Sequence, residues 1–429
     1  MKILFVYPRF QRHAEAHPEL KQWVPMNEYL GSPSLGIAMM AAVTPDDIVL
    51  EFRDDRLSPA DVPTDADVVA FSFFTAAASR GLELGDYFRA QGKKTIAGGI
   101  FPTMMPDECA SHFDSVVIGE GEPVWAQVIA DVRKGQLQPR YKATEIQSLA
   151  ALPLPRVDLY IDKEAGSFHP DDYPVQLSRG CPLNCQACAL PTSMTTSMRD
   201  FHLDHVVGQL EQLAKEGKRA CLTEDTSWFP GSAAKKLKAL FERIVARGAP
   251  ATISYIGISM PMILATGKPM LDLAKKAGVD MFYLVGGFDP VTKQAFTGKD
   301  PKALSRAYEA IAKSLDAGIE PYTSFLLGNE DDDEGTVDRM LEFAAKSGIT
   351  KAEFAIFTPY PGTPAWFRLL KEDRILDRTW SHYNDANCVF QPKNMTVEQV
   401  TQGYLRLWRE FYAGKNFQDR CVAERTIQF

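Results

Sequence analysis

The sequence predicts an α/β protein with a doubly wound parallel sheet, then a partial barrel of six βα units and a small helical region. Three observations favour this class. Short apolar runs alternate with helix-like segments. The runs are nearly continuous in hydrophobicity, as strands buried on both faces should be. Four later helices are each followed by a glycine, as C-terminal caps are: Gly248, Gly278, Gly318 and Gly348.

Composition excludes several classes of protein. Of 429 residues, 45% are hydrophobic and 24% are charged, which is ordinary globular composition. The net charge of −8 makes nucleic acid an unexpected partner. Seven cysteines are few and odd in number, which argues against a secreted disulfide scaffold. The longest uncharged stretch, Ala251–Gly267, is too broken by polar residues to span a membrane, so we expect a cytoplasmic chain.

The first βα series predicts a sheet with its ligand site at the carboxyl ends of the strands. We expect strands at Ile3–Tyr7, Ile48–Phe52, Val68–Ser72, Thr95–Ala97 and Val116–Ile118. Helices are expected at Leu35–Val43, Ser79–Ala90 and Pro123–Lys134. The residues that follow the strands include Ser72 to Thr75, Gly98-Gly99 and Gly119 to Glu122. No G-x-G-x-x-G follows the first strand, so a dinucleotide site is poorly supported.

The second series predicts an open barrel, because six units do not close an eight-stranded one. Its strands are expected at Val175–Ser178, Ala220–Thr223, Ile253–Ile258, Met281–Val285, Tyr322–Leu327 and Glu353–Phe357. Helices are expected at Ala233–Arg247, Met270–Ala277, Ala303–Leu315 and Thr336–Lys346. Chemistry in such a barrel belongs at the carboxyl ends of the strands.

Three cysteines follow the first of these strands, in the run Cys181-Pro-Leu-Asn-Cys185-Gln-Ala-Cys188. Thiolates at these spacings can hold one face of an iron–sulfur cluster. A zinc site completed by His169 or Cys221 is an alternative, and a disulfide with one spare thiol is less compatible with a cytoplasmic chain. We interpret the remaining cysteines, Cys109, Cys221, Cys388 and Cys421, as packing residues.

The cysteine motif and its place in the series resemble those of the radical SAM enzymes, and Leu177 to Pro182 is similar to the version in their cobalamin-binding branch. Similar motifs end later strands: Glu224-Asp225, Gly286 to Pro290, Phe325 to Gly328 and Thr358 to Pro364. The resemblance implies that Cys181, Cys185 and Cys188 hold a 4Fe-4S cluster whose open iron binds S-adenosylmethionine (SAM). It also implies SAM contacts at Glu224, Asp225, Ser254, Gly287 and Asp289. Helix capping, a turn, or a satisfied buried hydroxyl at Ser254 are the alternative interpretations.

The N-terminal half is similar to the Rossmann-like cobalamin-binding domain of that branch. Ser32 to Gly36 resembles the entry to its first helix, and Gly98 to Thr103 and Gly119 to Glu122 resemble its nucleotide-tail loops. The implied cobalamin contacts are Ser72, Thr75, Gly98, Gly99, Pro102, Thr103, Gly119, Glu120, Gly121 and Glu122. Because no Asp-x-His-x-x-Gly occurs, the resemblance implies a base-off corrin whose lower face is open or weakly occupied.

The resemblance implies a cobalamin-dependent radical SAM enzyme, in first place a methyltransferase that acts on an unactivated carbon through a 5′-deoxyadenosyl radical and methylcobalamin. One alternative is a cyclase, oxidoreductase or rearrangement enzyme without methyl transfer. Another is a non-catalytic cobalamin- or metal-binding regulator. The implied partners are a small-molecule, lipid or natural-product substrate and an electron donor such as a flavodoxin or ferredoxin.

The predicted boundaries are a cobalamin-binding domain at residues 1–140, a linker at 141–174, the radical SAM partial barrel at 175–370 and a mainly helical region at 371–429. In the last region, Thr396 to Gln399 form a capping box, and the helix that follows is expected to end before Gly414. We interpret it as a packing helix; a wall of the substrate pocket, with Trp380, His382 and Tyr383, is the alternative. Glu330 to Glu334 are expected to form a solvated acidic turn, and Arg199 to pair at the surface or approach SAM.

Overall fold

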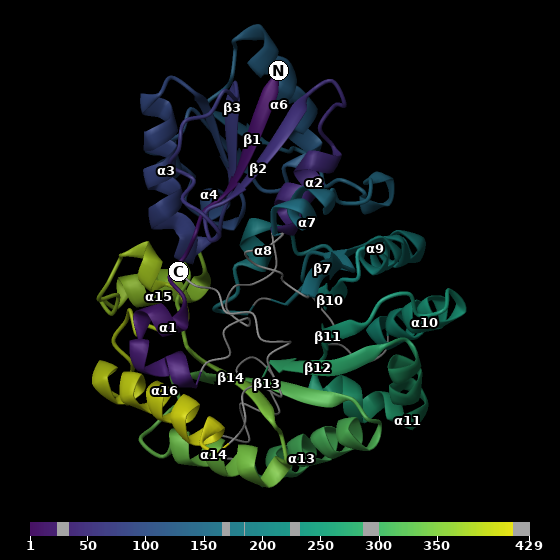
Figure 1. Ribbon diagram of the computed structural model, residues 1–429. Helices are drawn as coiled ribbons and strands as arrows, with labels where there is room; N and C mark the ends of the chain where they lie inside the picture. The colour runs from purple at the N-terminus through teal and green to yellow at the C-terminus, as the bar shows by residue number, and fades with distance from the viewer. Residues whose placement is uncertain (24–33, 165–171, 184, 224–231, 286–299, 415–429) are drawn as a thin grey trace.

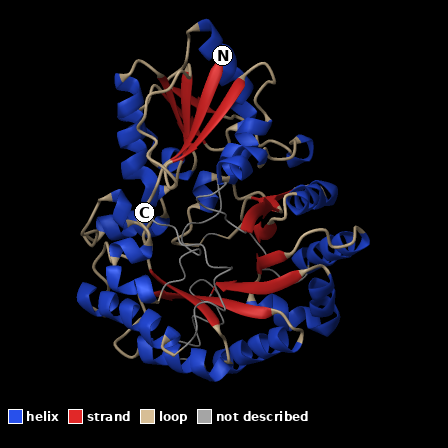
Figure 2. Ribbon diagram, viewed as in Figure 1, coloured by secondary structure: helices blue, strands red, loops and turns tan. Residues whose placement is uncertain are grey.

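A computed structural model describes the chain except residues 24–33, 165–171, 184, 224–231, 286–299 and 415–429 (Figure 1). Two parallel sheets with covering helices form its two main layered bodies (Figure 2). The predicted fold class is confirmed. None of the described helices is long and apolar enough to cross a membrane.

Six strands of the described chain form the first sheet, in the order β2-β1-β3-β4-β5-β6 and all parallel. They are β1 (Lys2–Tyr7), β2 (Val49–Asp54), β3 (Val68–Ser72), β4 (Lys94–Gly98), β5 (Ser115–Ile118) and β6 (Arg140–Lys142). The first five were predicted, and β6 adds an edge strand. Chain order reverses between β1 and β3, which opens a crevice at the carboxyl ends of the strands.

Helices cover this sheet on both faces (Figure 1). They are α2 (Leu35–Ala42), α3 (Ala78–Ala90), α4 (Ile100–Met104), α5 (Pro106–His112), α6 (Glu122–Lys134) and α7 (Asp158–Glu164). Apolar side chains on both strand faces explain this double cover, since Ile3, Leu4 and Val6 on β1 are completely buried.

The second sheet has the order β7-β10-β11-β12-β13-β14, again parallel throughout the described residues. Its strands are β7 (Asp172–Gln176), β10 (Arg219–Thr223), β11 (Ile253–Gly257), β12 (Val279–Val285), β13 (Glu320–Leu327) and β14 (Lys351–Ile356). β7 and β14 are the two edges, so the barrel is partial, as predicted. Its outer helices include α9 (Leu203–Lys215), α10 (Ser232–Ala246), α11 (Met260–Lys276), α13 (Pro301–Asp316) and α14 (Thr336–Ser347).

The glycines expected after four of these helices all have φ between 70° and 91°, the left-handed region that suits a C-terminal cap. One helix differs from its prediction. α11 begins at Met260, ten residues before the expected Met270, and a kink at Gly267 (φ 70°) interrupts it. The Ser259 side chain accepts from the Met262 amide and starts the helix early. An N-cap serine therefore starts an additional helical segment before the kink, and the predicted helix corresponds to the segment after it.

The C-terminal region packs against both sheets. It comprises α15 (Pro364–Lys371), the 3₁₀ turn η4 (Trp380–His382) and α16 (Val397–Tyr412), whose capping box at Thr396 and Gln399 is confirmed. Trp366, Trp380, Tyr383 and Val389 share a hydrophobic core with residues of the first sheet. At the other side, α16 lies beside α1 (His13–Ala16), which follows β1 (Figure 1). The domain boundaries near residues 140, 175 and 370 stay predictions.

Candidate functional site

The three-cysteine loop lies at the carboxyl end of β7, where a short antiparallel ribbon holds it. The ribbon is formed by β8 (Ser178–Arg179) and β9 (Arg199–Asp200). Between ribbon and loop, Gly180 has φ 91°, and a Cβ there would lie 2.2 Å from the Ser197 carbonyl oxygen. Only glycine fits this close approach. The sequence therefore turns sharply into Cys181.

Backbone contacts fix both ends of this loop. The Cys181 amide donates to the Thr195 carbonyl at 3.0 Å, and the Cys188 amide donates to the Cys185 carbonyl at 3.2 Å. From the motif after β14, the Ala365 amide donates to the carbonyl of Gln186 at 2.8 Å. The first turn of α15, which follows the last strand of the barrel, thus supports the loop that follows the first strand.

The three thiols of the loop differ in exposure. Cys181 is buried, whereas Cys185 and Cys188 are partly exposed, and no disulfide links the described cysteines. Burial raises the pKa of the Cys185 thiol. Among the described residues no three His, Cys, Asp or Glu side chains converge on one ion position. A four-iron cluster binds each thiolate through a different iron, so its ligands need no such convergence. His169, invoked for zinc, lies outside the described residues.

Most predicted SAM contacts cannot be placed. Glu224, Asp225, Gly287 and Asp289 lie outside the described residues. Ser254 is described and completely buried. It is the extra residue of a β-bulge near the amino end of β11, and its hydroxyl accepts from Arg219 Nε at 2.9 Å. Because SAM is expected at the carboxyl ends of the strands, this position favours the alternative interpretation, a satisfied buried hydroxyl.

A cavity of about 200 Å³ lies at the carboxyl ends of the first sheet, and we call it the glycine-lined cavity. Seven predicted cobalamin residues line it: Ser72, Gly98, Gly99, Gly119, Glu120, Gly121 and Glu122. Gly99 has φ 98°, and a Cβ there would lie 2.8 Å from the Phe73 backbone. At Gly119 a Cβ would meet nothing within 4 Å. The cavity is smaller than a typical ligand pocket of about 300–1,000 Å³ and suits one part of a large ligand.

The remaining predicted cobalamin residues stand behind this cavity. The Thr103 hydroxyl donates to the Gly99 carbonyl at 2.8 Å and accepts from the Gly119 amide at 2.9 Å. It thereby joins the two glycine loops. Thr75 and Pro102 are buried, and neither is among the lining residues. The sequence did not predict three lining residues from beyond the first sheet: Gln176 at the end of β7, Arg179 in β8 and Met194 between β8 and β9. Their presence puts the cavity where the two sheets meet.

Four charged side chains join the two loops, and we call them the interdomain charge network: Glu120, Glu122, Arg179 and Arg199. Arg179 Nη2 donates to Glu122 Oε1 at 2.7 Å, and Arg199 Nη1 donates to Glu120 Oε2 at 2.9 Å. All four side chains are 13% exposed or less. Arg199 therefore makes a buried pair with a loop of the first sheet, and the expected pairing at the surface is wrong.

The inner face of the barrel carries tyrosines around a carboxylate. Tyr322 Oη donates to Glu353 Oε2 at 2.8 Å, and Tyr283 Oη donates to the other Glu353 oxygen. Nearby, Tyr360 Oη donates to Asp385 Oδ1 at 2.7 Å. Burial raises the pKa of Asp385 to about 6, and the charge of Glu353 adds to the shift. This face offers hydrogen-bonding and aromatic groups to a ligand inside the barrel.

A larger cavity of about 560 Å³ lies beyond β1 and β2. Its arginines already have acidic partners: Arg80 Nε lies 2.8 Å from Asp55 Oδ2 and Arg56 Nη2 2.7 Å from Asp54 Oδ2. We assign no ligand to it.

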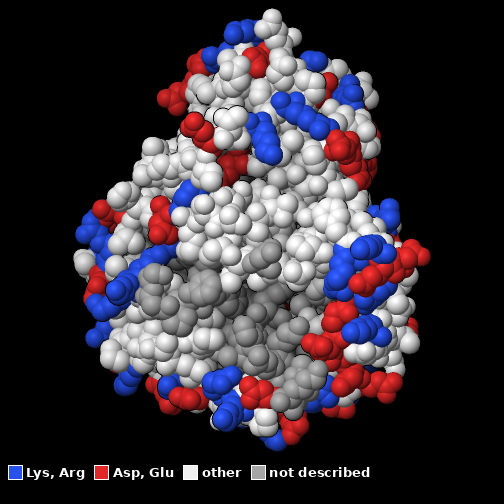
Figure 3. All heavy atoms as spheres, turned by 180° about the vertical axis from the view of Figure 1, so that it is seen from behind, with Lys and Arg blue, Asp and Glu red and all other residues white. Residues whose placement is uncertain are grey.

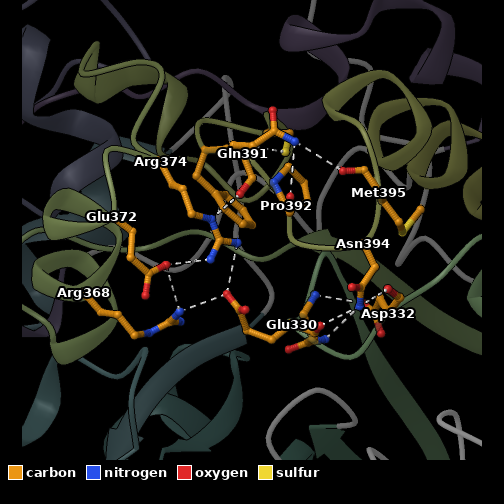
Figure 4. Close-up of polar contacts among 12 residues, drawn as sticks. Glu330, Asp332, Arg368, Glu372, Arg374, Gln391, Pro392, Asn394 and Met395 are labelled. Carbon is orange, nitrogen blue, oxygen red and sulfur yellow. Dashed lines mark hydrogen bonds and ion pairs between the residues drawn. The ribbon is translucent and has the colours of Figure 1, made fainter.

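The acidic turn after β13 is solvated at Asp331, Asp333 and Glu334, as predicted, whereas Glu330 and Asp332 contact the C-terminal region (Figure 4). Glu330 pairs with Arg368 at 3.0 Å and with Arg374 at 3.1 Å, both from the C-terminal region. Asn394 Nδ2 donates to the Glu330 carbonyl at 2.9 Å. The turn thus joins the barrel to the segment between α15 and α16.

Comparisons with known proteins agree with this arrangement. A family model described as a domain of unknown function, DUF4070, matches residues 363–426. The chain is 28% identical to bacteriochlorophyllide d C-12(1)-methyltransferase of Chlorobaculum tepidum over 403 residues, 91% of this chain and 84% of that protein. It is 25% identical to the anaerobic magnesium-protoporphyrin IX monomethyl ester cyclase of Cereibacter sphaeroides over 347 residues, 75% of this chain and 55% of that one.

A solved structure has the same fold. It is the radical S-adenosylmethionine methyltransferase TsrM from Kitasatospora setae, with tryptophan and a SAM analogue bound. The TM-score is 0.65 at 16% identity, over 86% of this chain and 76% of that one. Another structure of TsrM holds cobalamin and a [4Fe-4S] cluster.

Proposed function

We propose, since the chain belongs to the cobalamin-binding radical SAM enzymes, that it transfers a methyl group to a carbon atom of a small-molecule substrate. One observation carries the proposal: the cysteine loop of the barrel and the glycine loops of the first sheet meet across the interdomain charge network. Such a meeting has no purpose in a simple binding module, and it brings a cluster site beside a corrin site.

The residues present fit the implied cofactors. We assign Cys181, Cys185 and Cys188 to a 4Fe-4S cluster, because three thiols in one supported loop are the right donor set. The glycine-lined cavity suits the nucleotide tail of cobalamin, since Gly119 leaves open space beside it. When bound, these groups and SAM supply radical and methyl-transfer chemistry, while the protein positions them and excludes water. Glu224, Asp225, Gly287 and Asp289 remain our proposed SAM contacts.

The substrate would enter the barrel from the open side and lie against the inner tyrosines. Tyr255, Tyr283 and Tyr322 form a row with ring centroids 6.0 and 5.3 Å apart. Aromatic rows suit flat, largely apolar molecules. Tetrapyrroles are therefore the first substrates to test, in line with the names of both relatives. A flavodoxin- or ferredoxin-like protein in the cytoplasm would supply electrons.

Anaerobic reconstitution with iron, sulfide and hydroxocobalamin tests the assignment. We expect the cluster absorbance and reductive SAM cleavage to be lost in Cys181→Ala, Cys185→Ala and Cys188→Ala, with corrin still bound. Cys221→Ala, a buried cysteine within β10, is the matched control and should keep both properties. A cluster that survives any of the three substitutions would contradict the assignment.

A second function is a radical cyclisation or oxidation without methyl transfer, which similarity to the Cereibacter cyclase favours. Product analysis with a tetrapyrrole substrate separates the two. Methyl transfer gives S-adenosylhomocysteine together with 5′-deoxyadenosine, and a product heavier by one methylene. If 5′-deoxyadenosine forms without S-adenosylhomocysteine, the second function replaces the first.

A further inference from the structure

The two arginines of the interdomain charge network need the first sheet beside them. Arg179 and Arg199 are direct partners across the β8–β9 ribbon. Like charges opposite each other weaken a ribbon unless a counter-charge lies between them. Glu120 supplies it: its Oε2 lies 2.9 Å from Arg199 Nη1 and 3.7 Å from Arg179 Nη1. The ribbon that holds the cysteine loop is therefore completed by a loop of the other sheet.

The ion pairs of the network are buried, which strengthens the attraction between their charges. The Arg179 and Glu122 side chains are each 6% exposed, so their attraction is screened less than that of a surface pair. Arg179 also donates to Gln176 Oε1 at 3.0 Å, and its guanidinium lies over the Phe201 ring. Arg199 Nη1 donates to the Gln147 carbonyl at 2.8 Å. Because each guanidinium group is held by several partners, neither arginine can follow a displaced glutamate without losing other contacts.

The network has one cofactor site at each end. On one side, Gly119, Glu120, Gly121 and Glu122 line the glycine-lined cavity. On the other, Arg179 precedes Cys181 by two residues, and the intervening Gly180 is packed against Ser197. A displacement of Glu122 would therefore be transmitted to Cys181 through Arg179 and Gly180.

We propose that the interdomain charge network sets the distance and orientation between the corrin-bearing loop and the cluster-bearing loop. Glu120 and Glu122 then act as positioning residues through Arg199 and Arg179, and their carboxylates do not bind cobalamin directly. The proposal rests on the proposed function for the identity of the two cofactors.

Pulsed dipolar EPR on the holoenzyme, with the cluster reduced and cobalamin as cob(II)alamin, tests this without substrate or turnover. We expect one narrow distance distribution for the wild type. Arg179→Met removes the partner of the buried Glu122, and Glu122→Gln leaves the buried Arg179 with only its longer contact to Glu120. Each single variant should lower the unfolding midpoint by roughly 5 °C. The double variant removes both charges and should recover most of that loss. Its distance distribution should nevertheless be at least twofold broader than that of the wild type.

The pair Asp54–Arg56 is the matched control. Its side chains are 3% and 4% exposed, the separation is 2.7 Å, and both residues belong to the first sheet and its loop. The double variant Asp54→Asn/Arg56→Met should keep the wild-type distance distribution. An unchanged distribution in Glu122→Gln/Arg179→Met would overturn the proposal, because the pair would then be structural only. Loss of corrin from Glu122→Gln, but not from Arg179→Met, would also overturn it and make Glu122 a direct contact.

These outcomes differ from a failure of the proposed function. A wild-type protein that shows no cluster or cob(II)alamin signal contradicts the cofactor assignment itself. A wild type with both signals, beside variants of unchanged distance, contradicts the positioning role alone.

Discussion

Two of the contacts between the first sheet and the rest of the described chain have opposite chemistry. The interdomain charge network is made of four directional charges beside the proposed cofactor sites. On the other side, an aromatic contact joins Phe101 of α4 to Trp366, Trp380 and Tyr383, with Phe101 and Trp380 centroids 5.3 Å apart. Apolar burial is non-directional and scales with area, whereas buried ion pairs add little net stability but fix geometry. On the positioning role proposed above, the aromatic contact holds the two sheets together and the charge network aligns them.

Removing the largest side chain of the aromatic contact should have the largest effect. Trp380 is 8% exposed, and its Nε1 donates to Glu108 Oε1 at 2.5 Å. We expect Trp380→Ala to lower the free energy of unfolding by about 4 kcal/mol, measured by urea denaturation. Phe367→Ala on neighbouring α15 is the control, because this side chain is 61% exposed and its loss should cost under about 0.5 kcal/mol.

We expect the Trp380→Ala protein, where it is still folded, to keep the wild-type cluster–cobalt distance. The aromatic contact would then contribute to stability without setting the alignment of the two sheets. A loss below about 1 kcal/mol would contradict the role given to the aromatic contact.

A second apolar contact, between α1 and α16, should make stability depend on pH. His13 is 7% exposed, its Nδ1 lies 2.6 Å from Tyr404 Oη, and burial lowers the pKa of His13 to about 3. Between pH 6.5 and 3 the unfolded chain therefore binds a proton that the folded chain does not. The contribution of the neutral His13 to the free energy of unfolding is complete above pH 6.5. It falls as the pH decreases, by at most about 1.4 kcal/mol per pH unit.

Urea denaturation at pH 7 and pH 5 measures this dependence. We expect His13→Gln to lose about 2 kcal/mol less than the wild type between these pH values, because the neutral side chain cannot bind the proton. The exposed His202→Gln variant should behave as the wild type does. Equal losses in His13→Gln and wild type would show that His13 is not the titrating group.

The sequence predicted the strands well because burial on both faces leaves continuous apolar runs. It predicted the cysteine loop because the three cysteines are close in sequence. The sequence did not predict the features that depend on contacts between residues far apart in the chain. Ser254 lies in a β-bulge of β11, and its hydroxyl accepts a hydrogen bond from Arg219 on the neighbouring strand β10. Arg199 meets Glu120 from a distant loop. Glu353 is a charged residue between the apolar Ala352 and Phe354 of β14, and this departure could have indicated the polar inner face of the barrel.

We expect the smallest effect on stability in the acidic turn after β13, at Glu330. Its neighbour Asp332 is also a carboxylate but differs in burial and in its partners. Glu330 is 33% exposed and pairs with two arginines, so Glu330→Gln should cost about 0.5 kcal/mol and less at high salt. Asp332 is 7% exposed, and its Oδ2 accepts from the amides of Gly328 and Asn329, each at 2.8 Å. Asp332→Ala leaves buried amides without this acceptor and should cost about 2 kcal/mol at any salt concentration.

Urea denaturation at low and high ionic strength measures both effects. A Glu330→Gln cost that equals that of Asp332→Ala, with no dependence on salt, would mean that the ion pairs of Figure 4 hold the C-terminal region as firmly as buried hydrogen bonds do. The result that we expect, a smaller and salt-dependent cost for Glu330→Gln, means that solvent and salt screen the half-exposed ion pairs of Glu330. The pairs of the interdomain charge network are buried, so salt should affect them less.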